Sequence, residues 1–401
     1  MDATEAVWGV VAAARSVVIV GTGAAGYAVA EGLHVNGFVG DVTLVGEETG
    51  EPYDRPPLSK EVLSGAWEPS RAALIAAKRV APLNPQILTG VRAESLDARA
   101  HQVRLSDGRT LAYDALVVAT GVTPRRIAHP DLPNIHVLRT MDHSLALRSQ
   151  LLEGHPRLLV VGGGFLGLEV AATSRKLGAD VIVVEPIPGP PLASRVGTEA
   201  ATKLLTTHQS FGVEIHTGIG VADLAPGADN AIRATLADGT TVDADVVLVA
   251  VGSAPTVEWL ADSDLQVENG LVCDEFCNAG NDVWAAGDVA SWLHLGYQRR
   301  LRLEHRTNAQ EQGLAVASNI VGPRQPFMPV PYFWTNQYDV RLQLHGFITE
   351  DADTAIVEGG PGEDSFVQTF SRDGQVTAAL GWNAARRLAE YRRQLLADMS
   401  G

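Results

Sequence analysis

Apolar runs and glycines alternate near the start of the chain in the order of a nucleotide-binding unit. Residues 17–20 (VVIV) form a β-branched run that predicts a buried strand, and glycines follow at 21, 23 and 26. An alanine-rich stretch with helical spacing comes next, and a second apolar run, DVTLVG, ends just before Glu47. An acid about 20 residues past the last glycine completes a dinucleotide-binding pattern. The glycines let backbone N–H groups approach a pyrophosphate, and Glu47 is expected to accept hydrogen bonds from a ribose.

The same pattern occurs a second time. The stretch RLLVVGGGFLGLEVAA carries glycines at 162, 164 and 167, and the apolar run DVIVVE ends at Glu185. Two such units predict two bound nucleotides, and electron transfer between them is the natural reason for holding both. A duplicated domain with one inactive site is the alternative that the pattern leaves open.

Two closing strands and a Gly-Asp pair extend the pattern. YDALVVATG ends at Gly121, ADVVLVAVG ends at Gly252, and WAAGDVA places Asp288 directly after an apolar strand. A Gly-Asp pair alone is more often a turn. Together with the first glycine-rich turn and the ATG sequence, it indicates an FAD-binding domain that is interrupted by an NAD-binding domain.

The chain from about Pro326 has a different pattern. PVPYFWTNQYDVRLQLHG alternates apolar and polar residues, which predicts strands, and AARRLAEYRRQLL predicts a helix near the end. We therefore expect an α/β protein with two Rossmann-type domains and a smaller α+β domain. The expected division is FAD-binding at 1–124 and 253–325, NAD-binding at 125–252, and C-terminal at 326–401.

Composition excludes several classes of function. The 401-residue chain has a formal net charge of −16, which argues against nonspecific binding to nucleic acid or to an anionic membrane. No apolar run approaches the ~20 residues of a membrane helix. The first residues carry Asp2 and Glu5 where a secretory signal would be positively charged, so we expect a ragged tail and a cytoplasmic protein.

The two cysteines, Cys273 and Cys277, form a CxxxC arrangement. A metal site would need two further ligands nearby, and neither His294 nor His305 is a convincing one. We expect both cysteines to be ordinary strand or loop residues. His129, His136 and His143 are scattered along the chain, and no metal site is predicted.

The sequences VVIVGTGAAG, RPPLSKEVLSG, VVATG, VVGGGFLGLEVAA, WAAGDVA, NAQEQG and YFWTNQYD together resemble those of a known family. It is the single-component, putidaredoxin-reductase-like ferredoxin reductases, which are FAD- and NADH-dependent flavoproteins. They serve bacterial cytochrome P450s and Rieske-type oxygenases through a [2Fe–2S] ferredoxin. The resemblance implies a glutathione-reductase-like fold, bound FAD and NADH, and a ferredoxin partner. Apoptosis-inducing-factor-like oxidoreductases share most of these sequences.

The resemblance also implies which residues hold the cofactors. Ala25 is expected beside the FAD pyrophosphate, Glu47 at the adenosine ribose, Val91 at the adenine, and Asp288 at the ribityl chain or phosphate. The full set expected around FAD is Gly21, Gly23, Ala24, Ala25, Gly26, Glu47, Arg55, Lys60, Val91, Ala119, Thr120, Gly121, Arg139, Gly287, Asp288, Arg306 and Trp334. The set expected around NAD is Gly162, Gly164, Phe165, Leu166, Gly167, Glu169, Glu185 and Gly252.

Lys60 and Glu169 are the two residues expected to act in the reaction. The resemblance places Lys60 close to flavin N5, with Glu169 as its partner near the nicotinamide. On sequence alone, Lys60 could instead be a surface lysine in the first turn of a helix capped by Ser59. Glu169 could simply be an acid stabilised at a helix N-terminus.

The stretch EPYDRPPLSK, residues 51–60, contains no cysteine where related flavoenzymes keep a redox pair. Without a disulfide beside the flavin, electrons are expected to leave directly and singly to a ferredoxin. The missing cysteines count against a disulfide reductase or an NADH peroxidase. An NADH oxidase and an apoptosis-inducing-factor-like protein with a signalling or redox-sensing role remain as alternatives.

Three further expectations concern charged and polar residues. Glu185 would repel a 2′-phosphate, and no arginine follows it until Arg195, so NADH is favoured over NADPH. Arg306 and Asn336 depart from the family pattern, Arg306 beside the isoalloxazine where relatives are often apolar or aromatic. The basic run Arg299, Arg300 and Arg302 predicts either a docking patch for an acidic ferredoxin or a solvated face.

Overall fold

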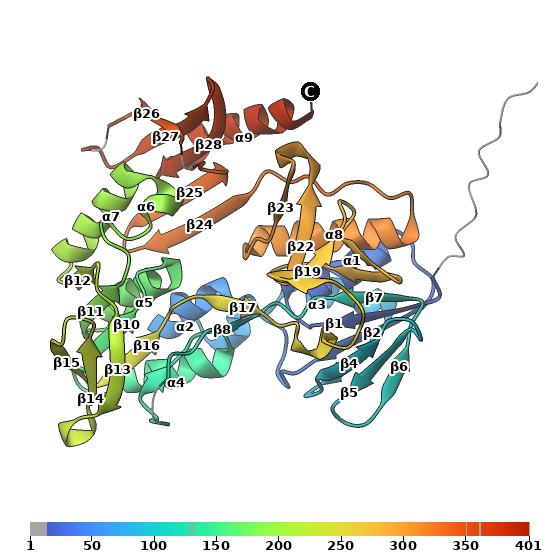
Figure 1. Cartoon of the computed structure of the whole chain (residues 1–401), viewed down its shortest axis with the longest axis horizontal. Helices are drawn as coiled ribbons and strands as arrows, with labels where there is room; N and C mark the ends of the chain where they lie inside the picture. The colour runs from blue at the N-terminus through green and yellow to red at the C-terminus, as the bar shows by residue number, and fades with distance from the viewer. Residues whose placement is uncertain (1–13, 129–130, 350, 361, 401) are drawn as a thin grey trace, which may run out of the picture.

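The computed structural model describes residues 14–128, 131–349, 351–360 and 362–400, and most of its strands gather into three larger sheets (Figure 1). The expected tail at the N-terminus lies outside the described residues. Within those residues, no helix is both long enough and apolar enough to cross a membrane.

The first sheet carries the N-terminal glycine-rich turn. Its strands run in the order β20, β21, β7, β1, β2, β3, and all neighbours are parallel except β20 and β21. The strands are β1 Ser16–Val20, β2 Asp41–Gly46, β3 Gln86–Thr89, β7 Ala115–Val118, β20 Asn278–Gly280 and β21 Val283–Ala285. Because β1 is central and fully covered, its side chains form the continuous β-branched run seen in the sequence.

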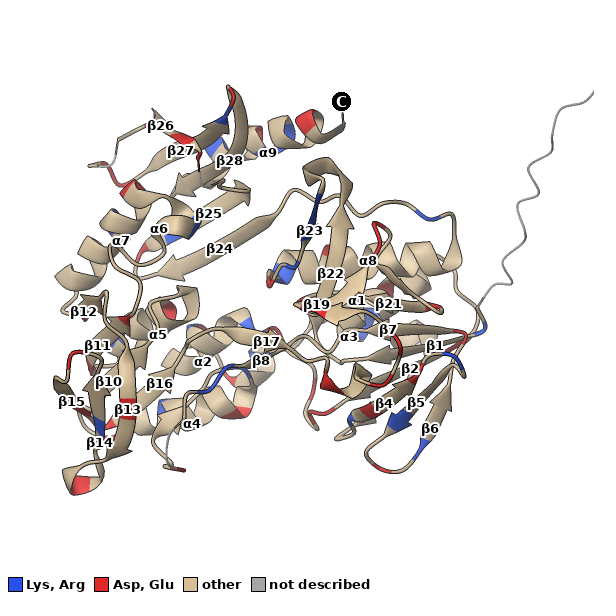
Figure 2. Cartoon of the chain, in the orientation of Figure 1, with Lys and Arg blue, Asp and Glu red and all other residues tan. Residues whose placement is uncertain are grey.

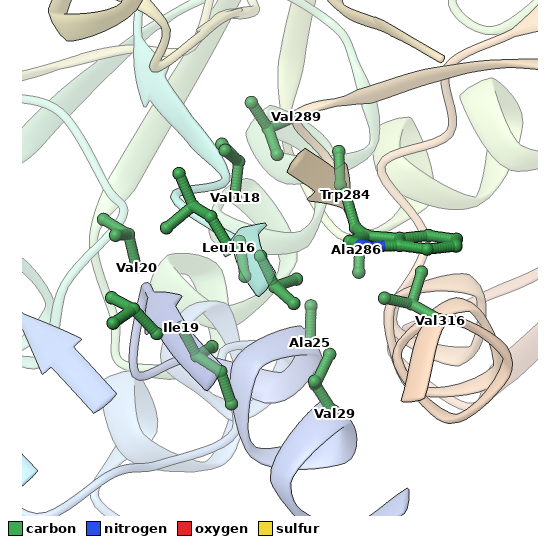
Figure 3. Close-up of a cluster of buried hydrophobic side chains, with 14 of the residues drawn as sticks. Ile19, Val20, Ala25, Val29, Leu116, Val118, Trp284, Ala286, Val289 and Val316 are labelled. Atoms are coloured by element: carbon green, nitrogen blue, oxygen red, sulfur yellow. The ribbon is translucent and has the colours of Figure 1, made fainter. Parts of the chain in front are cut away.

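Two helices, α1 (Ala24–Val35) and α8 (Arg306–Val321), pack against each other and against this sheet (Figure 3). Figure 3 shows side chains from β1, α1, β7, β21 and α8 meeting there, among them Ile19, Leu116 and Val316. Glycines permit the close crossing, since a Cβ at Gly313 would lie 2.7 Å from the Ala25 carbonyl oxygen. This crossing holds the N-terminus of α8 beside the N-terminus of α1.

The second sheet carries the second glycine-rich turn and is entirely parallel, in the order β12, β11, β10, β16, β9. Its strands are β9 Ile135–His136, β10 Arg157–Val161, β11 Asp180–Glu185, β12 Glu214–Thr217 and β16 Val246–Val249. The accompanying helices are α4 Met141–Leu151, α5 Phe165–Lys176, α6 Ala193–Val196 and α7 Thr198–Ser210. β8 (Val122–Pro124) and β17 (Ser253–Pro255) pair antiparallel where the chain passes between the two sheets.

The third sheet is antiparallel, in the order β24, β25, β28, β27, β26, and α9 (Ala385–Ser400) packs on it. Its strands are β24 Tyr332–Gln337, β25 Val340–Gly346, β26 Asp353–Glu358, β27 Phe366–Arg372 and β28 Gln375–Trp382. The strands and the terminal helix expected after residue 326 are therefore confirmed. Phe366, Phe370 and Trp382 join the apolar core of the second sheet.

Smaller elements complete the fold. Three further sheets are β4 Ala93–Asp97, β5 Gln102–Leu105 and β6 Thr110–Ala112; β13 Val221–Pro226, β14 Ile232–Leu236 and β15 Thr241–Ala244; and β18 Val267–Glu268, β19 Gly270–Cys273, β22 Ala290–His294 and β23 Arg299–Leu301. Short helices lie at η1 Pro56–Ser59, α2 Glu61–Ser64, η2 Pro69–Ala72, α3 Ile75–Arg79, η3 Ala81–Leu83, η4 Ala228–Asn230, η5 Glu258–Leu260 and η6 Leu295–Tyr297.

One segment crosses between cores in a way the sequence did not predict. Leu58, Val62 and Leu63, from η1 and α2, are buried in the core of the second sheet although they follow β2 of the first in sequence. α2 packs on α4 and α5 (Figure 1). The segment around residue 60 therefore connects the two nucleotide-binding units.

Candidate functional site

A cavity of ≈ 1180 Å³ lies where these elements meet. It runs from the glycine-rich turn after β1, past η1 and the start of α8, to the first turn of α5 and to β24. Its volume is slightly above the usual ~300–1,000 Å³ of small-molecule sites, which suits a dinucleotide. The cavity is therefore lined by both nucleotide-binding units at once.

The two glycine-rich turns have the same local geometry. The first glycine of each has a positive φ, +122° at Gly21 and +110° at Gly162. A Cβ there would lie 2.1 Å from the carbonyl oxygen of Ala119 in one case and 2.4 Å from that of Ala250 in the other. Only glycine fits such a position, because a side chain would both strain the backbone and collide with the neighbouring strand.

Of the other two glycines in each turn, one is packed against the protein backbone and the other faces empty space. A Cβ at Gly26 would lie 1.9 Å from the Gly21 oxygen, and one at Gly167 would lie 2.1 Å from the Gly162 oxygen. At Gly23 and Gly164, by contrast, no protein atom lies within 4 Å of a built Cβ. The open space at the N-termini of α1 and α5 fits a pyrophosphate that hydrogen-bonds to backbone N–H groups.

The residues expected around FAD nearly all line this one cavity. The structure brings together Gly21, Gly23, Ala24, Ala25, Glu47, Arg55, Lys60, Val91, Ala119, Thr120, Gly121, Arg139, Gly287, Asp288, Arg306 and Trp334 in its wall. Gly26 lies behind them, packed on Gly21. These placements agree with a flavin nucleotide along the cavity, while the contact of each residue with FAD stays a prediction.

The residues expected around NAD fall into two groups. Phe165, Leu166 and Glu169, on the first two turns of α5, line the same cavity as the FAD residues. Gly162, Gly164, Gly167, Glu185 and Gly252 lie outside the cavity wall, at the carboxyl ends of β10, β11 and β16 and at the start of α5. A nucleotide on the second turn would thus have one end at the cavity.

Glu185 is fixed at the end of β11. One carboxylate oxygen accepts a hydrogen bond from the Gly163 N–H at 2.7 Å, and the other accepts one from the Ile187 N–H at 3.0 Å. The carboxylate is therefore held against the glycine-rich turn itself. Glu47, at the corresponding place after β2, is exposed and lies 3.9 Å from Arg92.

Lys60 and Glu169 form a largely buried ion pair in the cavity wall. Their charged atoms are 2.6 Å apart, and the side chains are only 13% and 10% exposed. The same carboxylate accepts hydrogen bonds from the Ser59 hydroxyl at 2.5 Å and from the Thr335 hydroxyl at 2.8 Å. Lys60 is therefore not a surface lysine. Glu169 pairs with Lys60 and accepts from two hydroxyl groups, so its role is not only a favourable interaction with a helix N-terminus.

Ser59 does not cap a helix, so that alternative is wrong. The 3-10 turn η1 ends at Ser59, and Lys60 has non-helical backbone angles (φ −129°, ψ −93°) before α2 begins at Glu61. Its two prolines, Pro56 and Pro57, open η1 and direct the chain inward. As a result the Ser59 side chain is 1% exposed and turned toward Glu169.

A second polar cluster lies near the end of β21. Asp288 pairs with Arg139 at 3.2 Å, and Arg55 donates to the Arg139 carbonyl oxygen at 2.5 Å and to Glu48 at 2.9 Å. Burial raises the pKa of the Asp288 carboxyl, and the neighbouring Arg139 opposes that rise. A buried carboxyl with nearby guanidinium groups fits a ligand that presents both hydroxyls and phosphates.

Several residues in or next to the cavity wall were missed in the sequence. Tyr53 lines the wall, donates to Glu48 and accepts from the Met141 N–H at 2.9 Å. Asp54 lies just beyond it and pairs with Arg306, which also donates to Gln310 at 3.2 Å. Only the position of Tyr53 and Asp54 inside EPYDRPPLSK could have indicated them. Thr335 likewise had no signal beyond its position inside YFWTNQYD, because its partner Glu169 is 166 residues away in sequence.

The basic run expected to form a docking patch lies on and next to β23 (Figure 2), and only part of it is exposed. Arg299 and Arg300 on β23 are exposed, although one end of Arg300 donates to the Cys273 and Ser291 carbonyl oxygens. The Arg302 side chain is only 13% exposed and donates to Glu304 and to the Asp288 carbonyl oxygen. Arg302 therefore stabilises the fold next to Asp288, and only Arg299 and Arg300 can meet a partner.

The two cysteines are buried free thiols in the core of the first sheet, as expected for structural residues. Cys277 accepts a hydrogen bond from Gln312 at 3.2 Å. None of the described residues that line the cavity is a cysteine. Among the residues the structure describes, no three His, Cys, Asp or Glu side chains gather so that they could hold a metal ion.

Comparison with known proteins agrees with this geometry. Residues 15–313 match the model of the pyridine nucleotide-disulphide oxidoreductase family, and residues 332–400 match the reductase C-terminal family. The chain is 36% identical to rhodocoxin reductase of Rhodococcus erythropolis, over 86% of this chain and 81% of that protein. It is also 36% identical to the ferredoxin–NAD(+) reductase component of the p-cumate 2,3-dioxygenase system of Pseudomonas putida, over 94% and 92%. The crystal structure of the covalent putidaredoxin reductase–putidaredoxin complex superposes with a TM-score of 0.90 at 32% identity, covering 96% of this chain and 93% of that one.

Proposed function

Because the chain belongs to the pyridine nucleotide-disulphide oxidoreductase family and ends in a reductase C-terminal domain, we propose that it is a ferredoxin–NAD(+) reductase. It passes electrons from NADH through FAD to a [2Fe–2S] ferredoxin, which supplies a cytochrome P450 or a Rieske-type oxygenase. Named relatives support this, since one is a rhodocoxin reductase and another is the ferredoxin–NAD(+) reductase component of a dioxygenase system. Two free, buried cysteines suit the cytoplasm, where we place the enzyme.

One observation carries the proposal. The N-terminal part of α5, which belongs to the second glycine-rich unit, lines the cavity of the first unit through Phe165, Leu166 and Glu169. A nucleotide held on the second turn can therefore meet one held on the first without a large movement. Since the cavity wall described here contains no cysteine, the acceptor after FAD has to come from outside this chain.

We assign FAD to the first glycine-rich unit and NADH to the second. FAD, when bound, converts a hydride from NADH into single electrons for the ferredoxin. The turn at Gly21, Gly23 and Gly26 holds its pyrophosphate, and Asp288 and Arg139 orient the chain between the phosphates and the ring. The domains that do this are 1–124 with 253–325 for FAD, 125–252 for NADH, and 326–401 at the C-terminus.

Lys60 and Glu169 would shape the charge where the nicotinamide meets the flavin. Glu169 accepts three short hydrogen bonds, so it is held in one orientation and in turn holds the Lys60 ammonium group against the cavity. A fixed cation at this place favours a negative charge that develops beside it during hydride transfer. Glu185, held by two backbone N–H groups, selects NADH by binding both ribose hydroxyls and repelling a 2′-phosphate.

The test is a cytochrome c reduction assay with candidate [2Fe–2S] ferredoxins, using NADH and NADPH in parallel. We expect rapid reduction that depends on the ferredoxin and on NADH. Oxygen consumption of equal rate without any ferredoxin would contradict the proposal and favour an NADH oxidase. A slow turnover with a stable long-wavelength band would instead favour an apoptosis-inducing-factor-like role.

The docking part has its own test. Replacing Arg299 and Arg300 with Gln should raise the KM for an acidic ferredoxin and weaken its dependence on salt, because those charges steer the encounter. The matched control is Arg233→Gln on β14, an exposed arginine that pairs with Asp243. Equal effects of the two changes would refute a docking role for β23.

A further inference from the structure

A chain of buried hydrogen bonds leads from Glu169 across β24 to α7. Thr335 Oγ1 lies 2.8 Å from Glu169 Oε1, and Gln337 Nε2 lies 3.1 Å from Thr335 Oγ1. His208 Nε2 then lies 2.7 Å from Gln337 Oε1. Glu169, Thr335, Gln337 and His208 are 8%, 2%, 1% and 0% exposed. Three polar side chains beyond the ion pair are thus buried and hydrogen-bonded in one line. Packing alone would not require polar side chains at these buried positions.

The chemistry of the groups fixes the direction of every bond. An ionised carboxylate only accepts, so the single proton of the Thr335 hydroxyl points to Glu169 and its oxygen must accept from Gln337. The Gln337 amide therefore turns its NH₂ toward Thr335 and its oxygen toward His208. That oxygen needs a donor, which assigns the proton of His208 to Nε2. All the donors in the line point toward the carboxylate.

His208 can hold this arrangement because its ring is neutral. Burial lowers the pKa of His208, so at pH 7 the ring has one N–H to place. The other nitrogen, Nδ1, lies 3.4 Å from the Tyr338 hydroxyl, which stands at the end of the line. Since β24 places alternate residues on one face, Thr335 and Gln337 both point into this buried layer between α5 and α7.

We infer that His208 and Gln337 are positioning residues for the Lys60–Glu169 pair, an inference that depends on the proposed function for its kinetic consequence. Together they hold the Thr335 hydroxyl on Glu169 Oε1, which leaves Oε2 for Lys60 and Ser59. Without them, Thr335 is free to turn away and the carboxylate can rotate. Lys60 would then lose its single position in the cavity wall.

The kinetic test compares matched variants. His208→Leu and Thr335→Val should each slow the hydride-transfer step about tenfold, roughly the effect of one lost hydrogen bond to a charged group, with NADH affinity changed less than twofold. His208→Gln, which can still donate to Gln337, and Thr335→Ser should stay within about twofold of the parent. The double variant His208→Leu/Thr335→Val should be no slower than the slower single variant, because both act through the same bond.

A second readout does not depend on activity. In ¹⁵N NMR spectra of the flavoprotein, with the His208 signals assigned from their absence in His208→Gln, the ring should appear as the Nε2–H tautomer. In Gln337→Met the tautomer mixture should change, because the acceptor of that N–H is gone. A parent ring protonated at Nδ1, or multiplicative rate losses in the double variant, would overturn the inference. If NADH fails to reduce the flavin of the parent, the proposed function falls, and the tautomer alone decides whether this hydrogen-bonded line exists.

Discussion

Replacing Gly164 with alanine should weaken NADH binding strongly and leave the fold and FAD intact. Gly164 is the N-cap residue of α5, with φ −69° and ψ 179°, so an alanine can adopt its backbone conformation. A Cβ there meets no protein atom within 4 Å. The methyl group would instead occupy the space in which we place the NADH pyrophosphate.

The expected free-energy changes separate the effect of Gly164→Ala on stability from its effect on NADH affinity. Gly→Ala at a compatible site gains about 0.4–1 kcal/mol from the unfolded chain, and alanine at an N-cap loses roughly the same amount, so stability should change little. For NADH, displacement of the pyrophosphate breaks at least one charge-assisted hydrogen bond of about 1.5–3 kcal/mol. Affinity should therefore fall roughly 10- to 100-fold.

The assay measures NADH affinity from the concentration dependence of flavin reduction, FAD content from the visible spectrum, and stability from urea unfolding. Gly23→Ala is the matched control, since it adds a methyl group to equally open space at the other turn and should reduce FAD content instead. Gly167→Ala should damage folding, because its Cβ would lie 2.1 Å from the Gly162 oxygen. Normal NADH affinity in Gly164→Ala, or loss of FAD from it, would refute the assignment of the two turns.

Three further changes test other parts of the structure. Lys60→Met leaves Glu169 buried without its cation and should lower the free energy of unfolding, measured by urea denaturation, by about 3 kcal/mol. Adding Glu169→Leu to the same chain should restore much of that loss. An unchanged free energy of unfolding in Lys60→Met would show that the pair is not buried in solution. Glu185→Ala should raise the KM for NADH about tenfold while the KM for NADPH falls, measured in the cytochrome c assay; a parallel change for both coenzymes would contradict the role of this carboxylate. Burial lowers the pKa of His345 from 6.5 to about 4. As the pH falls below 6.5, His345 therefore becomes protonated in the unfolded chain but stays neutral in the folded protein, and the free energy of unfolding decreases until about pH 4. His345→Phe should therefore reduce the loss of stability between pH 8 and pH 5 by about 2 kcal/mol, and an unchanged loss would argue against a neutral buried ring.

The local parts of the site could be predicted from the sequence. Gly21 and Gly162 begin tight turns that are formed by residues close together in sequence, so a short motif identifies them. The strands beside them appear as apolar runs because both faces of the sheet are covered. The acids Glu47 and Glu185 follow at a spacing that the βαβ unit itself dictates. The α/β class and the order of the units depend on such local signals alone.

The polar partners could not be predicted in the same way. Ser59 and Thr335 meet Glu169 across 110 and 166 residues of sequence, and no periodicity connects them. Ser59 resembled a helix cap because serine before an acid-containing apolar stretch commonly is one, but the tertiary partner decided its orientation. Arg302 likewise appeared in the sequence as part of a basic run, whereas in the structure its guanidinium group pairs with Glu304.

Anaerobic stopped-flow mixing of the purified flavoprotein with NADH observes directly whether the two nucleotides meet in one cavity. We expect rapid bleaching of the oxidised flavin band, followed by its recovery when an oxidised [2Fe–2S] ferredoxin is added. A flavin band that NADH leaves unchanged, or a protein that binds no flavin, would contradict it.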